Sequence, residues 1–332
     1  MNKIVHVDSH IIGHHNVNFP IMRRRFEEAG CEFIMACCKT KEEVLEATKD
    51  ANAIITTYFP IDKEIMANAP DLKVVIRNAV GFEILDIEGA TELGIPICNI
   101  PDYCSVDVAY HTIALIMALE KKLKVSNKNV EKGVWSILAG YPIYRVCNQT
   151  LGLIGFGRIG KNVARFAKGL DMNVVVYDPY LPDEVFAENG VKRVSLDELF
   201  RISDVVTINT LLTEETRNLV NKDSIARMKD GVIIINTSRG AMVNTNDLLD
   251  AIDAGKVKAA GLDVLAEEPL RDPDARVLKY DNVIVTSHIG MDSEDATADN
   301  FTKCTDTVLS ILLKGELTYN VLNKKALQER NA

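Results

Sequence analysis

The sequence of 332 residues contains no apolar run long enough to cross a bilayer, which takes about 20 residues. It also shows no secretory signal at its start, because MNKIVHVDSH holds only a short alternating run that suits a first strand better than a signal peptide. These absences predict a chain with no membrane-spanning helix and no membrane partner. We therefore expect a cytoplasmic protein.

Paired cysteines and blocks of basic residues are missing as well. The seven cysteines are odd in number and irregularly spaced, and Cys37 and Cys38 are the only close pair, so neither a disulfide framework nor a metal site is predicted. Asp and Glu outnumber Lys and Arg by 47 to 38, which gives a formal net charge of −9. This charge disfavours nucleic acid as a partner.

Short apolar runs alternate with helical stretches along the sequence. This alternation is typical of α/β proteins with parallel sheets, and 332 residues exceed the usual size of one domain. The predicted strands are 4–7, 33–36, 53–56, 74–76, 95–98, 151–154, 174–176, 205–208, 232–236, 259–263 and 283–286. Long helices are predicted for 105–122, in which His111 is expected to be structural, and for 294–314. We expect two Rossmann-like or flavodoxin-like domains with doubly wound parallel sheets.

The stretch LGLIGFGRIGKNVARFAKGLDMNVVVYD, residues 151–178, has the pattern of a dinucleotide-binding turn. Gly155, Gly157 and Gly160 follow the spacing G-x-G-x-x-G between an apolar strand and an amphipathic helix. They allow a tight turn, a close approach of backbone to a pyrophosphate, and close packing of the helix on the sheet. Asp178 ends the next strand, where its carboxylate can bind ribose hydroxyls and repel a 2′-phosphate. Since the two residues after it carry no positive charge, the pattern favours NAD over NADP.

Four polar residues lie at or after the carboxyl ends of predicted strands, where ligands bind in open parallel sheets: Arg239, Asp263, Glu268 and His288. Arg239 can bind and polarise an oxo acid through its planar fork. His288 can donate a proton near neutral pH, with Glu268 to hold its ring, and Asp263 can accept a hydrogen bond from the nicotinamide amide. Each residue alone would more often be a turn or surface residue. Their combination with the glycine pattern favours a hydride-transfer site.

Five motifs, LGLIGFGRIG, YDPY, NTSRGAMVN, GLDVLAEEP and TSHIG, resemble those of the D-isomer-specific 2-hydroxyacid dehydrogenase family. The resemblance extends from about Ala53 to about Lys314. It implies NAD as the cofactor and Arg239, Glu268 and His288 as the catalytic set. It further implies reversible reduction of a 2-oxo acid to the (R)-2-hydroxy acid and a homodimer formed through the NAD domain.

The same resemblance implies two sets of binding residues. The cofactor set is Gly155, Gly157, Arg158, Ile159, Gly160, Asp178, Asn209, Thr210, Leu211, Thr216, Thr237, Ser238, Arg239, Asp263, His288 and Gly290. The substrate set is Arg77, Ala79, Val80, Gly81 and Arg239, with Ala79 in place of a glycine that is usual in the family.

We expect the NAD domain, residues 103–297, to be inserted into a substrate domain formed by 1–102 and 298–332, with the active site in the cleft. The alternative to an enzyme is an NAD-sensing binding protein with little turnover. It would be similar to the C-terminal-binding-protein corepressors, whose branch residues 95–104 and YDPYLPDE also resemble. The complete catalytic set favours the enzyme.

Overall fold

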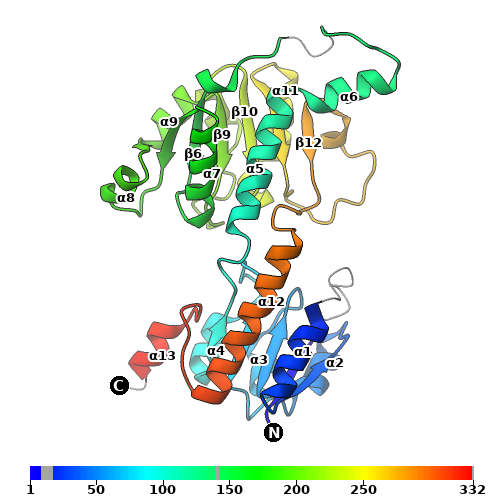
Figure 1. Cartoon of the computed structure of the whole chain (residues 1–332), viewed down its shortest axis with the longest axis vertical. Coiled ribbons are helices and arrows are strands. Elements are labelled where there is room, and N and C mark those ends of the chain that lie inside the picture. Colours follow the sequence, from blue (N-terminus) through cyan, green and yellow to red (C-terminus); the bar gives the residue numbers. More distant parts are fainter. Residues whose placement is uncertain (9–17, 139–141, 331–332) are drawn as a thin grey trace. The chain divides into compact units, whose positions relative to one another are not determined.

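The computed structural model describes residues 1–8, 18–138 and 142–330. Contacts within the chain divide it into two compact units (Figure 1). Unit 1 comprises Met1–Cys104 and Ser293–Ala332, and unit 2 comprises Ser105–Asp292. The chain therefore leaves unit 1, forms unit 2 and returns to unit 1. None of the described helices is long and apolar enough to span a membrane.

The described part of unit 1 forms a five-stranded parallel sheet in the order β2-β1-β3-β4-β5. Its strands are β1 (Lys3–His6), β2 (Glu32–Met35), β3 (Ala53–Thr56), β4 (Val74–Arg77) and β5 (Ile97–Cys98). Its α-helices are α1 (Asn18–Glu28), α2 (Lys41–Thr48), α3 (Lys63–Ala67), α4 (Ile87–Leu93), α12 (Glu294–Leu309) and α13 (Lys324–Arg330). This strand order is the flavodoxin-like one.

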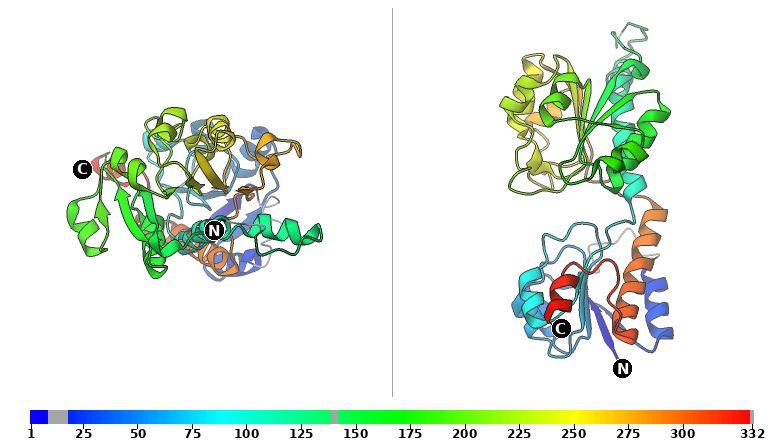
Figure 2. Two further views of the ribbon diagram at one scale, coloured as in Figure 1. Left: turned by 90° about the horizontal axis from the view of Figure 1, so that it is seen from above. Right: turned by 90° about the vertical axis from the view of Figure 1, so that its left-hand side faces the viewer.

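Helices cover both faces of the unit 1 sheet. On one face α1 and α12 lie side by side (Figure 2), and Phe26 and Phe301 pack there with the sheet. On the other face Val44 of α2 and Ile65 of α3 pack against the strands. Because both faces are buried, the inner strands β3 and β4 are apolar up to their last residue instead of alternating.

The described part of unit 2 forms a seven-stranded parallel sheet in the order β12-β11-β10-β9-β6-β7-β8. Its strands are β6 (Thr150–Ile154), β7 (Asn173–Tyr177), β8 (Lys192–Arg193), β9 (Val205–Ile208), β10 (Val232–Asn236), β11 (Val257–Leu262) and β12 (Val283–Val285). Its α-helices are α5 (Ser105–Glu120), α6 (Leu123–Glu131), α7 (Arg158–Gly169), α8 (Asp183–Glu188), α9 (Leu196–Ile202), α10 (Lys222–Arg227) and α11 (Thr245–Asp253).

The unit 2 sheet is also covered on both faces. Leu115 of α5 and Val163 of α7 belong to the core on one face, and Leu199 of α9 and Leu248 of α11 belong to the core on the other. The strand order reverses between β6 and β9, which lie next to each other. At such a reversal the loops beyond the carboxyl ends of the two strands diverge and leave a crevice in which ligands bind.

The structure confirms the predicted α/β class and the parallel sheets. Three predicted strands, 53–56, 205–208 and 232–236, have the bounds of β3, β9 and β10. The predicted long helix 294–314 differs, because α12 ends at Leu309 and the chain continues as a π-helix, Ser310–Lys314. Apolar periodicity continues through this change in winding and does not reveal it.

Candidate active site and cofactor site

The turn between β6 and α7 contains the three glycines of the predicted pattern. Gly155 has a φ of +93°, and a Cβ there would lie 2.6 Å from the carbonyl oxygen of Asn209. A Cβ on Gly160 would overlap the carbonyl group of Gly155. At Gly157, in contrast, the space is open, and α7 begins there without a side-chain cap. The first N–H groups of this helix are therefore available to a phosphate.

Asp178 directly follows β7, and two backbone N–H groups hold its carboxylate. The N–H of Phe156 donates to Oδ2 at 2.9 Å, and the N–H of Tyr180 donates to Oδ1 at 3.0 Å. Since Phe156 lies between the first two glycines of the turn, the acid predicted to bind ribose lies beside the turn predicted to bind pyrophosphate.

Polar groups after the end of β9 also belong to the predicted cofactor site. Both polar side-chain atoms of Asn209 are buried without a hydrogen-bond partner among the described residues. Ser238 Oγ donates to the carbonyl of Ile208 at 2.7 Å, and Thr216 Oγ1 donates to the carbonyl of Leu211 at 2.7 Å. The remaining predicted cofactor residues of these turns are exposed or half-buried: Arg158, Ile159 and Thr210. An uncapped helix, an adjacent carboxylate and an orphaned amide together fit NAD.

His288 and Glu268 form a hydrogen-bonded pair. Nδ1 of His288 lies 2.8 Å from Oε2 of Glu268, and the N–H of Leu265 donates to Oε1 of the same carboxylate at 2.9 Å. Nε2 of His288 makes no hydrogen bond within the part of the chain that the structure describes. A proton on Nδ1 satisfies the bond to the carboxylate, so Nε2 is the nitrogen that can exchange a proton with a ligand.

Asp263 follows β11 and anchors the segment that carries His288. Its Oδ1 accepts hydrogen bonds from Thr286 Oγ1 at 2.5 Å and from the N–H of Ile289 at 3.0 Å, and its Oδ2 accepts one from the N–H of Gly290 at 2.9 Å. His288 lies between these contacts with a φ of +58°. This left-handed conformation is costly for a residue with a Cβ, and the contacts of Asp263 hold the backbone in it.

The carboxylate of Asp263 is 2% exposed and remains strongly acidic. Burial opposes ionisation, but hydrogen bonds from His111, Thr286 and the backbone outweigh it and hold the pKa at about 2. His111 is at 2.9 Å from Thr286 Oγ1 and at 3.3 Å from Oδ1 of Asp263. Since protein donors occupy both oxygens, the main observed role of Asp263 is to fix the His288 segment. Its predicted contact with the nicotinamide amide stays a prediction.

Arg239 lies in a tight turn after β10. The side chain of Asn236 donates to its carbonyl oxygen at 2.9 Å, and its Nη1 donates to the preceding carbonyl oxygen at 2.9 Å. The next residue, Gly240, is buried, and a Cβ there would overlap the backbone of Leu265 and Ala266. The arginine turn therefore packs directly on the segment that leads to the carboxylate paired with the histidine.

The predicted substrate loop lies at the end of β4 in unit 1, whereas the catalytic set belongs to unit 2. Arg77 Nε donates to the carbonyl of Thr57 at 3.0 Å, and its Nη1 donates to Glu83 at 3.1 Å. The N–H groups of residues 79–81 donate to no other described residue. The arginine thus holds the loop together, and the backbone N–H groups remain available to a carboxylate.

Two contacts at the carboxyl ends of the unit 2 strands were not predicted from the sequence. Thr112 Oγ1 lies 2.9 Å from Thr237 Oγ1, which ties α5 to the end of β10, and Thr286 joins His111 to the anchoring aspartate. The signal in the sequence was a threonine and a histidine in an otherwise apolar helix. Within the described ranges, no group of three or more His, Cys, Asp or Glu could hold a metal ion.

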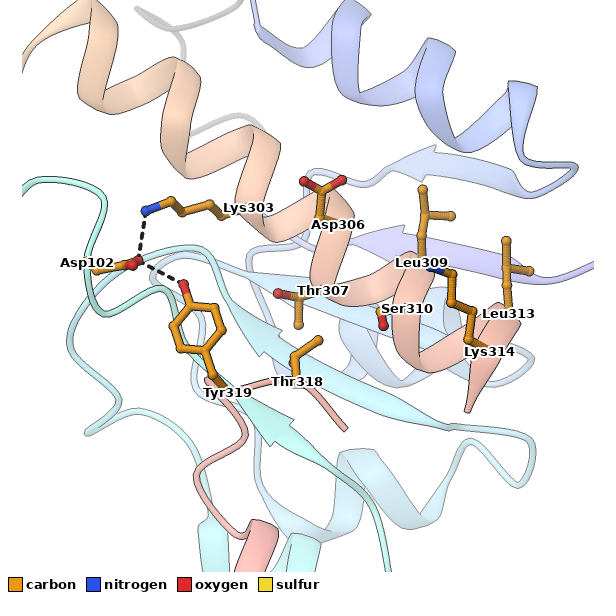
Figure 3. A pocket seen from close by; sticks show the side chains of 10 residues that line it. All are labelled: Asp102, Lys303, Asp306, Thr307, Leu309, Ser310, Leu313, Lys314, Thr318 and Tyr319. Carbon is orange, nitrogen blue, oxygen red and sulfur yellow. Dashed lines mark hydrogen bonds and ion pairs between the residues drawn. The ribbon is translucent and has the colours of Figure 1, made fainter. Parts of the chain in front are cut away.

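Unit 1 has a separate hollow of about 760 Å³, shown in Figure 3. Its acids are paired with protein donors: Asp102 pairs with Lys303 at 3.0 Å and accepts a hydrogen bond from Tyr319 at 2.9 Å, and Asp306 pairs with Arg25. None of the predicted site residues lines this hollow. Nothing in it resembles the histidine–glutamate pair of unit 2.

Comparison with known proteins gives matches over most of the chain. Residues 113–290, which include the glycine turn and the catalytic set, match the family model of the D-isomer specific 2-hydroxyacid dehydrogenase NAD binding domain. D-3-phosphoglycerate dehydrogenase of Methanocaldococcus jannaschii is 38% identical over 301 residues, which are 90% of this chain and 56% of that protein. The chain spans about half the length of the phosphoglycerate dehydrogenases it matches.

Two further relatives are covered almost completely. Glyoxylate reductase of Korarchaeum cryptofilum is 34% identical over 298 residues, which are 88% of each chain. The crystal structure of a glyoxylate reductase from Paecilomyes thermophila matches with a TM-score of 0.84 and 27% identity, over 97% of this chain and 99% of that one. These relatives carry the names of enzymes, which supports the enzyme over the corepressor-like alternative.

Proposed function

This chain belongs to the D-isomer-specific 2-hydroxyacid dehydrogenase family, and we propose that it is an NAD-dependent oxidoreductase that interconverts a 2-oxo acid and the (R)-2-hydroxy acid. The observation that carries the proposal is the 2.8 Å contact between His288 and Glu268, in the same unit as the glycine turn. In this assignment unit 2 is the NAD domain, predicted as 103–297, and unit 1 is the substrate domain, predicted as 1–102 with 298–332.

Each residue of the catalytic set has a distinct task. The nicotinamide of bound NAD supplies or takes up the hydride. Nε2 of His288 gives a proton to the carbonyl oxygen in reduction and takes it from the hydroxyl in oxidation, while Glu268 holds the ring through Nδ1. Arg239 binds the carboxylate and carbonyl side of the oxo acid through its planar fork. The free N–H groups of residues 79–81 are suited to a second contact with the carboxylate.

We further propose that two copies associate through unit 2. None of the side chains of α6 is buried, and the segment after it exposes Trp135 to 89% and Ile137 to 95%. An apolar segment this exposed is typical of an interface. We take its partner to be a second copy of the chain, and expect Trp135→Glu with Ile137→Glu to convert a dimer into a monomer in analytical ultracentrifugation. A monomeric wild type would contradict this.

We also propose a cytoplasmic location and no nucleic-acid partner. The net charge of −9 supports the absence of a nucleic-acid partner, because it opposes attraction to polyanions. Retention of the purified protein on heparin at physiological salt would contradict it.

A substrate panel tests the proposed reaction. The names of the relatives suggest glyoxylate, hydroxypyruvate and 3-phosphohydroxypyruvate, and the assay is the loss of NADH absorbance with each. We expect one or more of them to be reduced by the wild type and not by His288→Ala. NADH binding without turnover of any 2-oxo acid would overturn the enzymatic assignment and favour the binding protein.

A further inference from the structure

We propose that Arg193 is a latent ligand for the 2′-phosphate of NADPH, and that the carboxylate of Asp178 keeps it from that role. The inference rests on the proposed function, because it presumes that the ribose of NAD lies at Asp178. It assigns to Arg193, which none of the sequence motifs contains, a part in the choice between NADH and NADPH.

The sheet places Arg193 beside Asp178. Arg193 ends the short edge strand β8 and pairs in register with Val176 of β7, two residues before the acid. Its Nη2 donates to the carbonyl oxygen of Asp178 at 3.2 Å. The guanidinium therefore lies at the end of the strand from which the ribose acid extends.

The present contacts of Arg193 are easily exchanged. Nη1 pairs with Oδ1 of Asp183 at 2.6 Å, but the side chain of that acid is 82% exposed, and exposed ion pairs contribute little. The guanidinium also lies 5.2 Å from the centre of the Phe186 ring. A hollow of about 700 Å³ opens beside it, lined in part by Tyr177, Pro179 and Ser195. Asp183 and Glu198 line it as well, so the hollow offers the guanidinium space to move and is not by itself a phosphate site.

The carboxylate of Asp178 prevents this use of the site. It carries a negative charge and occupies the N–H groups of Phe156 and Tyr180. Replacing Asp178 with serine removes its electrostatic repulsion of a phosphate. It also removes the carboxylate oxygens that now accept hydrogen bonds from these two N–H groups. The two freed N–H groups and the guanidinium, whose Nη2 already contacts the carbonyl oxygen of Asp178, would then be donors of the kind that binds phosphates in proteins.

The neighbouring cation Lys192 serves as a matched control. It is the other residue of β8, and its Nζ pairs with Glu198 at 2.9 Å. Side chains alternate along a strand, and Lys192 is not among the residues that line the hollow. Removing its charge changes the net charge of the chain equally and removes no donor from the hollow; its partner Glu198 lines the hollow, but their exposed ion pair contributes little.

The experiment measures dissociation constants for NADH and NADPH by cofactor fluorescence. The proteins are the wild type, Asp178→Ser, and Asp178→Ser combined with Arg193→Gln or with Lys192→Gln. We expect Asp178→Ser to bind NADPH at least about tenfold more tightly than the wild type, and the added Arg193→Gln to reverse this gain by about tenfold, the effect of one charge-assisted hydrogen bond. The added Lys192→Gln should change NADPH binding by no more than about twofold.

The outcomes separate this inference from the proposed function. An NADPH gain that persists after Arg193→Gln, or no gain at all in a variant that still binds NADH, would overturn the role of Arg193 alone. A folded wild type that binds no NADH would overturn the NAD assignment itself. If Asp178→Ser fails to fold, Asp178→Asn replaces it in the same comparison, because it removes the charge and keeps the size of the side chain. Loss of its NADPH gain on adding Arg193→Gln supports the role, and a gain that persists overturns it.

Discussion

Replacing Asp263 with asparagine should destabilise unit 2 and slow catalysis through the same contacts. The carboxylate is 2% exposed and accepts hydrogen bonds from Thr286 and from the N–H groups of Ile289 and Gly290. An amide keeps one acceptor oxygen but turns an NH₂ group toward one of these donors. At least one buried N–H group is then left without an acceptor.

The pKa of Asp263 gives the magnitude. Hydrogen bonds outweigh burial and lower this pKa from 3.8 to about 2, a difference that corresponds to about 2 kcal/mol of stability at neutral pH. The unsatisfied N–H group adds about 1 to 3 kcal/mol. Because the folded-state pKa is depressed, the contribution of the carboxylate is fully present above about pH 4 and is lost as the pH falls toward 2.

The catalytic effect follows from the backbone of His288, which has a φ of +58° between the two N–H groups that Asp263 binds. Without this anchor the left-handed conformation, which costs about 1 to 3 kcal/mol, relaxes and the ring moves away from its position. We expect kcat of Asp263→Asn to fall about tenfold to a hundredfold while the dissociation constant for NADH changes little.

Urea denaturation and 2-oxo acid reduction test both effects, with Asp230→Asn as the control. Asp230 is 91% exposed and pairs only with Lys256 among the described residues, so its replacement should change stability by less than about 0.5 kcal/mol. The difference in stability between the wild type and Asp263→Asn should be constant from about pH 8 to pH 5 and should narrow below about pH 4. Equal stability and equal kcat in the two variants would refute the anchoring role.

Three other outcomes are expected. Arg239→Lys should lose kcat/KM for 2-oxo acids with nearly unchanged NADH binding, because a point charge cannot replace the planar fork, and unchanged turnover would remove this arginine from the site. Glu268→Gln removes the carboxylate that Nδ1 of His288 contacts at 2.8 Å, so kcat for reduction should fall about tenfold with nearly unchanged NADH binding, and an unchanged kcat would mean that the two residues are not coupled in catalysis. His6 is fully buried, and burial, opposed by Asp8, lowers its pKa from 6.5 to about 4. Its folded-state pKa lies below the unfolded value, so neutral His6 contributes to the free energy of unfolding above about pH 6.5, and this contribution is lost as the pH falls. Between about pH 7 and pH 5 the free energy of unfolding of the wild type, measured in urea titrations, should fall by about 2 kcal/mol more than that of His6→Gln. Equal decreases in the two proteins would contradict this.

Local patterns in the sequence were sufficient for much of unit 2. The glycine turn could be predicted because a strand, three glycines, a helix and an acid follow one another within 28 residues, 151–178. Buried parallel strands such as β9 and β10 are apolar at all but one position each, which made their bounds predictable. The histidine–glutamate contact could be predicted because both residues follow strands that end at the same edge of one sheet.

Backbone conformation was harder to predict than position. That TSHIG follows a strand indicates where His288 lies, but no pattern shows that its φ is +58°. This conformation depends on the buried carboxylate of Asp263, which is 25 residues away in the sequence and was interpreted as a ligand of the cofactor. A residue after a strand can bind a ligand or hold the loop that does. The sequence pattern is the same in both cases, and the direction of the hydrogen bonds distinguishes them.

Pairing between strands brings a positive charge close to Asp178 that its neighbours in the sequence do not supply. The two residues directly after Asp178 carry no positive charge. The charge comes instead from β8, fifteen residues further on, which is too short and too polar for any apolar pattern to reveal it as a strand. Once β8 pairs with β7, the two charges are brought together by register alone. In the proposal made above, cofactor choice depends on the balance between Asp178 and Arg193, and removing the carboxylate is expected to let the guanidinium bind the 2′-phosphate.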